Sequence, residues 1–351
     1  MVTANLSRSS GRAPLQVISP ARLHLGLVNE SGYLDRVDGG LGVQVRFPRW
    51  EYRLSPANYL GVIGDVAAEL EQNALSVLRR CCARFGIDGA ELTILEGIPL
   101  HAGLGAKTSF LASIVKAIAS WTDHKPSIDC VARLSGRGGT SGVGINAIHT
   151  GGFIIDVGRR FGTEKDAFLP SSRHNDRAPR TLPPFRLRGY SIVHFRFGDS
   201  GISGAQEADF FAQSCPIPVE ETKELLLQLY GRLLPALLED DDAELQASLR
   251  TLQNVGLKRR EWEIQSEVSR RFRGFFESAG LNEALCLSSV GPTVAVITRR
   301  PSEVLEVIGQ FESRPVHLEK TCVSQEGMIM NSLPQGDEPN GVVNSHPTSN
   351  S

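Results

Sequence analysis

Residues 97–109, with the sequence GIPLHAGLGAKTS, decide the fold that we predict for this chain. An apolar stretch typical of a strand, residues 92–96, precedes them, and a helical pattern from Thr108 to Trp121 follows. The turn Gly103-Leu104-Gly105 therefore lies at a helix N-terminus. Unpaired backbone N–H groups and the positive end of the helix dipole favour an anion at such a position.

Three polar residues stand at the predicted start of this helix. Lys107 supplies a mobile cation, and the hydroxyl groups of Thr108 and Ser109 can cap the helix or contact a phosphate. The alternative is a strand–helix turn in which Gly103 and Gly105 only relieve steric strain, which is the more common meaning of an isolated Gly-x-Gly pattern. Two further stretches favour the anion site.

A second glycine-rich stretch, GRGGTSGVGINAIHTGGFIIDVG, occupies residues 136–158 and contains eight glycines. So many glycines cost conformational entropy on folding, and packing alone does not explain them. We predict a loop that brings its backbone close to a ligand, followed by a buried strand over residues 151–156. The donors suited to a phosphate or a ribose hydroxyl in this loop are Arg137, the Gly139 backbone, Thr140, Ser141 and Asn146.

The third informative stretch lies near the N-terminus, where a strand over residues 15–19 runs into SPARLHLGL, residues 19–27. Alternation along a strand places Arg22 and His24 on the same side, opposite the apolar residues. The segment RVDGGLGV, residues 36–43, follows a turn and carries Arg36 and Asp38 in what we interpret as a glycine-rich loop. A surface ion pair in a hairpin turn is the alternative for that pair.

Composition limits the class of protein. The chain has 351 residues, which is enough for two domains, and its 41% hydrophobic and 22% charged content is typical of a globular protein. The net charge of −2 argues against a general affinity for nucleic acid or an acidic membrane. Because there is no run of 18 apolar residues and no apolar signal segment at the N-terminus, we expect a cytoplasmic protein.

Metal-binding motifs do not stand out in the sequence. The six cysteines have no CxxC spacing, and the eight histidines form no HxxxH or HExxH pair. We therefore expect free or buried thiols and no structural zinc site. The acidic run at residues 239–242 is interpreted as a solvated corner between two helices.

The pattern along the chain predicts an order of domains and elements. We expect a disordered arm (1–13), an N-terminal domain with both glycine loops (14–185), a C-terminal domain (186–330) and a disordered tail (331–351). The basic segment 171–180, which carries Arg173, Arg177 and Arg180, is either a solvated loop or a flap over an acidic substrate. Helices are predicted over 65–85, 126–134, 219–238, 243–275 and 302–311, and later strands over 190–197, 284–287, 293–298 and 316–319.

Eight stretches occur in an order that resembles a known superfamily. They are SPARLHLGL, RVDGGLGV, HAGLG, GRGGTSGVG with GGFIIDVG, GISGAQEADFF, CPIP, LLPALLEDD and SSVGPT, and they span about residues 15–325. This order resembles the GHMP superfamily of small-molecule kinases, and most of all its ATP-independent branch, the beta-ribofuranosylaminobenzene 5'-phosphate synthases. The resemblance implies an α+β, two-domain fold, with an N-terminal α/β domain and a ferredoxin-like C-terminal domain around a ligand cleft.

The resemblance also implies an activity. Members of this branch join phosphoribosyl pyrophosphate to an aromatic carboxylic acid, release pyrophosphate and CO2, and leave a C–C ribosyl bond. The branch includes the C-glycoside synthases of formycin- and pyrazofurin-type C-nucleoside antibiotics. Because CO2 is lost in place of a proton, no strong general base is required, which agrees with the lack of a carboxylate dyad or a Ser-His-Asp order in this sequence.

Residue roles follow from the same resemblance. The phosphates, with Mg²⁺ on the pyrophosphate oxygens, would contact the two glycine-rich stretches, and a polar group near the N-terminus would bind the acceptor and support catalysis. Asp156 is either part of the site or a strand-end cap. The predicted phosphate ligands are Gly103, Gly105, Lys107, Thr108, Ser109, Arg137, Gly139, Thr140 and Ser141, and the predicted acceptor and catalytic residues are Arg22, His24, Arg36 and Asp38.

Two departures from the family pattern bear on the acceptor. Synthases that act on 4-aminobenzoate tend to have GLGS and a glutamate before the GGF strand, whereas this chain has Ala106-Lys107 and His149-Thr150. An added cation and an imidazole suit a more acidic acceptor, so we favour a pyrazole carboxylate over the 4-aminobenzoate of methanopterin biosynthesis. A homodimer is possible for this superfamily.

Three other functions compete with this prediction. They are an ATP-dependent GHMP kinase, a non-catalytic binding protein for a phosphate ligand, and an ordinary phosphoribosyltransferase. The kinase needs paired serines where this chain has Ala106-Lys107. The phosphoribosyltransferase is disfavoured because no apolar strand ends in paired acids followed by a Thr/Gly loop.

Overall fold

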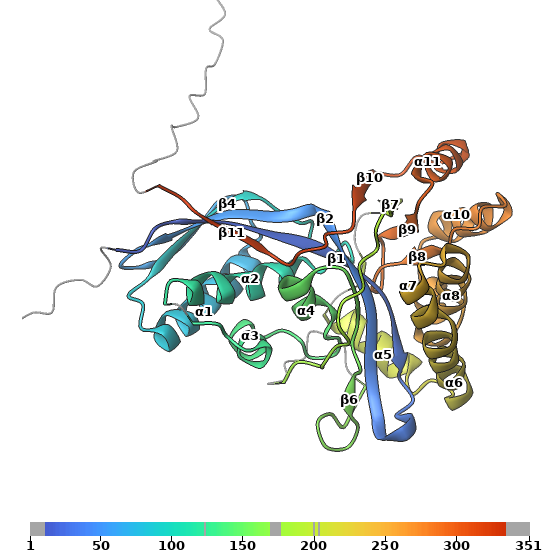
Figure 1. Cartoon of the computed structure of the whole chain (residues 1–351), viewed down its shortest axis with the longest axis horizontal. Coiled ribbons are helices and arrows are strands. Elements are labelled where there is room, and N and C mark those ends of the chain that lie inside the picture. The colour runs from blue at the N-terminus through green and yellow to red at the C-terminus, as the bar shows by residue number, and fades with distance from the viewer. Residues whose placement is uncertain (1–10, 123, 169–176, 199–200, 203, 335–351) are drawn as a thin grey trace, which may run out of the picture.

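The computed structural model describes residues 11–122, 124–168, 177–198, 201–202 and 204–334. These residues form two sheets with helices packed against each, and Figure 1 shows the first sheet with α1–α4 beside it and the second sheet with α6–α8, α10 and α11. The first sheet has seven strands, with the path β11-β1-β2-β4-β3 and with β5 and β6 paired to β2. The second has the order β10-β7-β9-β8. This is the predicted α+β arrangement.

Two long antiparallel strands dominate the first sheet. The strand β1 (Leu15–Asn29) pairs with β2 (Arg36–Pro56) from Leu15 opposite Leu54 to Asn29 opposite Asp38. Bulges between Pro20 and Arg22 and between His24 and Gly26 shift the register, as bulges commonly do near functional sites. The other strands are β3 (Leu60–Ile63), β4 (Ala90–Glu96), β5 (Phe153–Ile155) and β6 (Arg159–Arg160).

One helix, α2 (Ala106–Ser120), fills the centre of the first domain. Eleven of its 15 residues are buried, which follows from the apolar and small side chains of the sequence FLASIVKAIA. Its Phe110 ring stacks on Trp50 of β2 with ring centroids 4.5 Å apart. The helices around it are α1 (Ala68–Phe85), α3 (Ile128–Ser135) and α4 (Val143–Thr150).

The second domain has its own aromatic core. Phe195 of β7 packs edge-on against Phe272 of α10, and Phe276 and Trp262 belong to the same buried cluster. The strands are β7 (Ser191–Arg196), β8 (Leu285–Leu287), β9 (Val294–Thr298) and β10 (His317–Cys322). The helices are α5 (Ala205–Ser214), α6 (Val219–Gln228), a π-helix (Leu229–Leu233), α7 (Leu234–Glu239), α8 (Asp242–Asn254), α9 (Gly256–Glu263), α10 (Glu267–Ser278) and α11 (Pro301–Gln310).

Two predicted elements need correction. The single helix predicted over 243–275 is three helices, because the backbone turns at Gly256 (φ +66°), whose N–H donates to the Glu221 carboxylate, and Ser266 then caps α10. The loop predicted over 136–158 contains the helix α4, whose N-terminus is satisfied by a carboxylate from outside the helix. The prediction of a loop from the glycine content was therefore wrong for residues 143–150, which are helical.

The C-terminal segment returns to the first sheet. The strand β11 (Ile329–Ser332) pairs antiparallel with β1, and Figure 1 shows the chain crossing from β10 back to that sheet. Residues 331 and 332, predicted to belong to a disordered tail, are thus strand residues that complete the open edge of β1. Residues 13 and 333, also predicted to be disordered, take part in hydrogen bonds: the Trp121 indole donates to the Ala13 carbonyl (2.9 Å), and the Leu333 N–H donates to the Pro14 carbonyl (2.8 Å). Residues 1–10 and 335–351 of the predicted arm and tail lie outside the described residues, as does Arg173 of the basic segment.

The predicted domain division at residues 185 and 186 falls in the segment between β6 and β7. A 3-10 helix (Tyr33–Asp35) joins β1 to β2 where a turn was expected. Within the described part of the chain, each helix is too short or too polar to cross a membrane.

Candidate functional site

A cleft lies where the glycine turn 103–105, strand β1 and the turn 288–291 of the second domain meet. It has an outer and an inner section, and both are lined by Arg22, Thr108 and Arg137. The outer section also includes His101, Gly103, Leu104, Gly105, Ala106 and Lys107. The inner section also includes His24, Leu27, Gly138, Thr140, Ser141, Gly144, Phe211 and Glu261.

The N-terminus of α2 opens onto the outer section of this cleft. Gly105 precedes the helix with a left-handed backbone (φ 73°, ψ 22°), and no side chain caps it. Gly105, Ala106, Lys107 and Thr108 all line the outer section. The first N–H groups of α2 are therefore available to an anionic ligand, as predicted from the sequence.

Two arginines add positive charge beside this helix start. The Arg22 guanidinium donates to the Gly103 carbonyl (2.8 Å), and it lies so close over Gly105 that a β-carbon there would be 3.0 Å from it. The Arg137 guanidinium donates to the Thr108 hydroxyl (3.0 Å). Burial, and then Arg137, lowers the pKa of Arg22 to about 10, so Arg22 stays charged at neutral pH.

His24 lines the inner section and is held by the second domain. Its backbone N–H donates to the Ser288 hydroxyl (3.0 Å), and its carbonyl accepts from the Ser289 N–H (2.8 Å). The ring Nε2 is buried and has no hydrogen-bond partner among the described groups. Burial, followed by the charges of Arg22 and Lys258, holds the pKa of His24 well below its usual value. The neutral ring is thus free to hydrogen-bond a ligand at pH 7.

The turn SSVGPT closes the cleft from the second domain. The Ser288 hydroxyl donates to the Gly103 carbonyl (2.7 Å), which also accepts from Arg22. A β-carbon on Gly103 would lie 2.5 Å from the Ser288 carbonyl oxygen, so this contact requires glycine. The glycine turn therefore joins both domains at the site as well as starting α2.

Two acidic residues of the cleft were missed by sequence reasoning. Glu207 of α5 lines both sections, and Glu261 of α9 lines the inner section. Burial raises the pKa of Glu207, and Arg137 opposes that shift. Glu261 pairs with the buried Lys258, which also donates to the carbonyls of residues 287 and 289. Glu207 lies in the quoted stretch GISGAQEADFF, but Glu261 lies in the charged run KRREWE, which is typical of a surface helix.

Arg36 and Asp38 do not line the cleft in the described structure, contrary to the prediction. Both lie in β2, because that strand begins at Arg36. Arg36 donates to the carbonyls of Val157 (2.6 Å) and Gly158 (3.1 Å). Asp38 is 1% exposed and pairs with Lys165 (2.7 Å), so this pair is also not the surface ion pair of the alternative interpretation.

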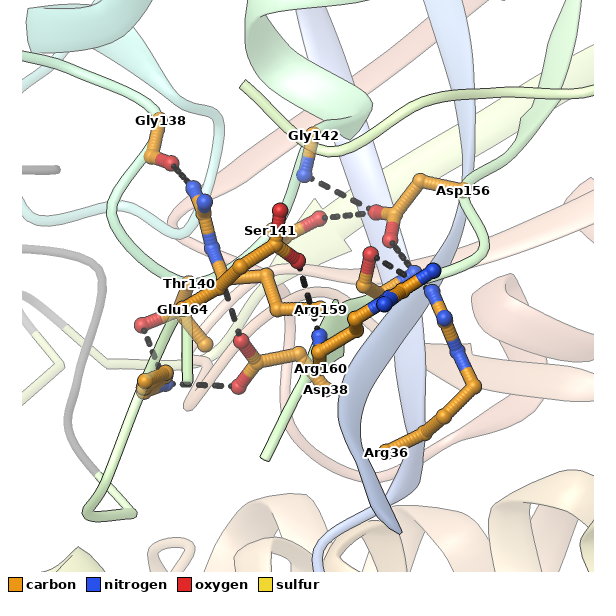
Figure 2. Close-up of polar contacts among 12 residues, drawn as sticks. Arg36, Asp38, Gly138, Thr140, Ser141, Gly142, Asp156, Arg159, Arg160 and Glu164 are labelled. Atoms are coloured by element: carbon orange, nitrogen blue, oxygen red, sulfur yellow. Dashed lines mark hydrogen bonds and ion pairs between the residues drawn. The ribbon is translucent and has the colours of Figure 1, made fainter. Parts of the chain in front are cut away.

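Asp38 belongs to a network of polar contacts, drawn in Figure 2, that reaches Gly138 and Thr140 of the inner cleft lining. The buried Arg159 lies 3.9 Å from Asp38 and donates to the Gly138 carbonyl, while Lys165 also reaches the Thr140 hydroxyl (3.5 Å). Burial raises the pKa of Asp38 to about 6, and Lys165 opposes that shift. Asp38 is thus a positioning residue for the cleft-lining loop around residues 138–141.

Asp156 closes the start of α4. Its carboxylate accepts from the Gly142 N–H (2.9 Å), the Ser141 hydroxyl (3.0 Å) and the Gly158 N–H (3.0 Å), as Figure 2 shows. The Asn146 amide donates to the carbonyls of residues 142 and 179, away from the cleft. Of the two interpretations of Asp156, the capping role agrees with the structure.

Three further predicted ligands, Ser109, Gly139 and His149, are absent from the described cleft lining. The buried Ser109 hydroxyl contacts the Ser19 hydroxyl (2.8 Å) and donates to the Pro20 carbonyl (2.9 Å), inside the core. His149 lies in the last turn of α4. Burial, then Lys116, lowers the pKa of His149 to about 4. Lys107 does line the outer section, where it pairs with Glu69 (2.6 Å).

Comparison with known proteins first defines the class. Residues 72–151 match the GHMP kinases N terminal domain. Homoserine kinase from Cytophaga hutchinsonii has the same fold, with a TM-score of 0.63 and 16% identity over 93% of this chain and all of that one. Mevalonate diphosphate decarboxylase from Staphylococcus aureus has a TM-score of 0.64 and 12% identity over 91% of this chain and 98% of that one. The fold is that of the GHMP superfamily.

Curated relatives then define the family. Beta-ribofuranosylphenol 5'-phosphate synthase from Methanothermobacter thermautotrophicus is 30% identical over 307 residues, 85% of this chain and 93% of the relative. The synthase of the same name from Archaeoglobus fulgidus is 29% identical over 81% of this chain and 88% of its own length. The chain belongs to the beta-ribofuranosylphenol 5'-phosphate synthase family of pentosyl-transferring enzymes, which confirms the branch predicted from its motifs.

Proposed function

We propose that this enzyme transfers ribose 5-phosphate from phosphoribosyl pyrophosphate to a ring carbon of an aromatic or heteroaromatic carboxylate, with release of CO2 and pyrophosphate. The observation that carries the proposal is the uncapped N-terminus of α2 beside Arg22 and Arg137. This part of the cleft suits a leaving group that gains negative charge as it departs. Membership of a pentosyl-transferring family supports the same reaction class.

The proposed reaction balances without a general base. The bond between C1 of the ribose and the pyrophosphate oxygen breaks, and its electron pair leaves with pyrophosphate. The ring carbon that carries the carboxylate forms the new bond to C1. The ring then regains its aromatic electrons from its bond to the carboxyl carbon, which departs as CO2. The neutral His24, together with Arg22, is suited to orient the acceptor during this sequence.

The inner section provides the surfaces that such an acceptor needs. Leu27, Phe211 and Val290 form an apolar lining for a flat ring, and His24 and Arg22 supply polar groups at the same section. The relatives' name refers to a ribosylated phenol. We favour a pyrazole carboxylate for this chain because of the departure Ala106-Lys107, which places a cation in the outer lining, although Lys107 also pairs with Glu69. His149 no longer supports that preference, since it lies outside the described lining.

Mg²⁺ is part of the proposal as a partner of pyrophosphate. Glu207 fits this group, because its carboxylate lines both sections of the cleft and oxygen atoms are the ligands that Mg²⁺ prefers. Glu261 fits less well, since Lys258 already occupies its carboxylate. When bound, Mg²⁺ would neutralise part of the charge on the departing pyrophosphate.

The test is pyrophosphate release from phosphoribosyl pyrophosphate and Mg²⁺, with CO2 trapped in parallel. The acceptors compared are 4-aminopyrazole-3,5-dicarboxylate, 4-hydroxybenzoate and 4-aminobenzoate. We expect equal amounts of pyrophosphate and CO2, with the highest kcat/KM for the pyrazole. Turnover with a benzoate and none with the pyrazole would overturn the acceptor preference and leave the reaction class intact.

A second measurement separates the proposed reaction from a kinase. Thermal unfolding is followed with phosphoribosyl pyrophosphate or with ATP, each with Mg²⁺, since a ligand that binds the folded state raises the Tm. We expect a shift with phosphoribosyl pyrophosphate only. A shift with ATP alone, together with ADP formation from a small alcohol, would contradict the proposal.

A further inference from the structure

Three side chains outside the cleft form a compact group on the second sheet. His194 of β7 lies directly opposite Glu319 of β10, and His317 is two residues from Glu319 on the same face of β10. The two imidazole rings are stacked, with centroids 5.5 Å apart. The His194 side chain is fully buried, whereas His317 and Glu319 are 36% and 27% exposed, so the group is open to solvent on one side.

The distances within this group match those in a metal centre. Glu319 Oε2 lies 3.5 Å from His194 Nε2 and 3.5 Å from His317 Nε2. Tetrahedral zinc sites hold nitrogen and oxygen ligands at roughly 2.0–2.1 Å, which separates neighbouring ligand atoms by about 3.3–3.4 Å. One ligand atom from each of the three residues lies within 4.8 Å of the others, a spacing that this group alone achieves among the described residues. Once His194 Nε2 releases the Phe47 carbonyl oxygen, which lies 3.2 Å away, the three side chains can hold a Zn²⁺ ion between them.

We propose that His194, His317 and Glu319 form a site for Zn²⁺ that is separate from the cleft. Two imidazoles and one carboxylate are a common zinc ligand set, and a water molecule would complete the tetrahedron on the exposed side. His194 and His317 are 123 positions apart, which explains why the spacing of histidines in the sequence predicted no zinc site.

The surroundings of the group support a cation there. The His317 Nε2 atom is buried and has no hydrogen-bond partner among the described groups, so it is available to a metal. The Glu96 carboxylate adds negative charge near Glu319, and a divalent cation would relieve the repulsion between them. Arg49 pairs with Glu96 (3.1 Å) and with Glu51 (2.6 Å), which offsets part of this charge.

The site would connect the two domains. The His194 Nε2 lies 3.2 Å from the carbonyl oxygen of Phe47 in β2, a strand of the first sheet. Thr321, also in β10, accepts a hydrogen bond from the Phe47 N–H (3.1 Å). Zn²⁺ bound by β7 and β10 would thus fix the part of the second sheet that contacts β2. We expect bound Zn²⁺ to stabilise the full chain against unfolding.

The test uses the full-length protein after treatment with a chelator. Zn²⁺ binding is measured by calorimetry and metal analysis, and Co²⁺ is used as a spectroscopic probe because tetrahedral Co²⁺ has intense visible bands. We expect one equivalent of Zn²⁺, a tetrahedral Co²⁺ spectrum and a Tm raised by a few degrees, with no such shift from Mg²⁺.

Variants at the exposed ligands make the test specific. His317→Gln and Glu319→Gln should each weaken Zn²⁺ binding at least tenfold and abolish the tetrahedral spectrum, while circular dichroism confirms that they fold. The control is His124→Gln, an exposed histidine between α2 and α3, which should bind as the wild type does. Unchanged binding in the His317→Gln, Glu319→Gln double variant would overturn the proposal, as would a wild-type chain that binds no Zn²⁺.

Discussion

The two glycine-rich stretches both lead into a helix, but the N-terminus of α2 is uncapped whereas that of α4 is bound by a carboxylate. At α2 no side chain caps the helix, and its first residues line the cleft beside Arg22. At α4 the Asp156 carboxylate accepts from the Gly142 N–H and the Ser141 hydroxyl. The first helix start can bind an external anion, whereas the second already holds an internal one.

This difference shows that glycine content alone does not identify an anion site. What decides is whether a carboxylate from elsewhere in the fold occupies the helix start. Gly40 packs so closely on Ser141 and Asp156 that a β-carbon there would be 2.4 Å and 2.5 Å from their side-chain oxygens. Gly40 of β2 therefore serves close packing against the start of α4, whereas Gly103 and Gly105 before α2 also line the outer section of the cleft.

The largest expected effect comes from removing the cation at the open helix start. Arg22→Ala should lower kcat/KM for phosphoribosyl pyrophosphate by about 10²–10³-fold, because the leaving pyrophosphate loses a charged donor. Steady-state pyrophosphate release measures this. The matched control is Arg36→Ala, whose guanidinium contacts the carbonyls of residues 157 and 158 and lies outside the described cleft lining. Equal losses in both variants would remove Arg22 from the proposed site.

The next prediction compares the cost of adding a β-carbon at two glycines, one in a tightly packed position and one in open space. Gly103 and Gly136 both have positive φ, but only at Gly103 would a β-carbon meet another atom, the Ser288 carbonyl oxygen at 2.5 Å. We expect Gly103→Ala to cost about 2–3 kcal/mol of unfolding free energy and Gly136→Ala about 1 kcal/mol. Urea unfolding compares the two. Similar costs would indicate that the turn 288–291 moves away without difficulty.

A smaller effect is expected at the closed helix start. Asp156→Asn leaves fewer acceptors for the Gly142, Ser141 and Gly158 donors, so it should cost about 1–3 kcal/mol of stability. Because this carboxylate stands where an anion would bind at α4, KM for phosphoribosyl pyrophosphate should change less than about threefold. Kinetics and urea unfolding of the same preparation check both statements. A larger rise in KM than Arg22→Ala causes would assign the phosphate site to α4 and reverse the comparison.

The smallest expected effect is on the stability of the fold at acid pH, and it comes from His149 in the last turn of α4. Burial lowers the pKa of His149 to about 4, while an unfolded histidine titrates near 6.5. Between these values the unfolded chain binds the extra proton, so His149 should destabilise the fold as the pH falls from about 6.5 to about 4, by on the order of 1 kcal/mol. His149→Gln should remove this part of the decline in Tm.

Other buried titratable groups contribute equally to the pH dependence of Tm in the wild type and in His149→Gln, so the difference between the two isolates His149. Asp38, with a pKa near 6, titrates in the wild type and in the variant alike, as does His194, whose pKa is lowered to about 4. His124→Gln, at an exposed position, should leave the pH profile unchanged. The measurement is Tm against pH with a chelator present. Parallel curves for wild type and His149→Gln would contradict the burial of this ring.

Sequence patterns were most informative where a local rule decided the structure. The glycine turn before α2, Ser127 as the cap of α3 and the strands around SSVGPT follow from turn chemistry and apolar periodicity. The pairing of Arg22 with His24 also follows, since a strand places alternate residues on one side. The sequence left open whether Thr108 or Ser109 caps α2, and the structure shows no side-chain cap there.

Contacts between distant segments could not be predicted in this way. Asp38 was expected in the site, but Lys165, 127 residues away, neutralises it under the cleft. Glu261 lines the cleft although its charged helix has the composition of a surface helix. The strand β11 has little local signal, and it forms because β1 offers an open edge.

The sequence by itself determined the superfamily, the α+β class and the glycine turn at the start of α2, because these depend on neighbours along the chain. Tertiary structure alone decided which acid closes α4, which polar groups share the cleft, and that His194, His317 and Glu319 meet on one face. The physical reason is that burial and charge pairing act through space. A side chain's protonation, partners and access to a ligand are therefore fixed only when strands and helices from both domains pack together.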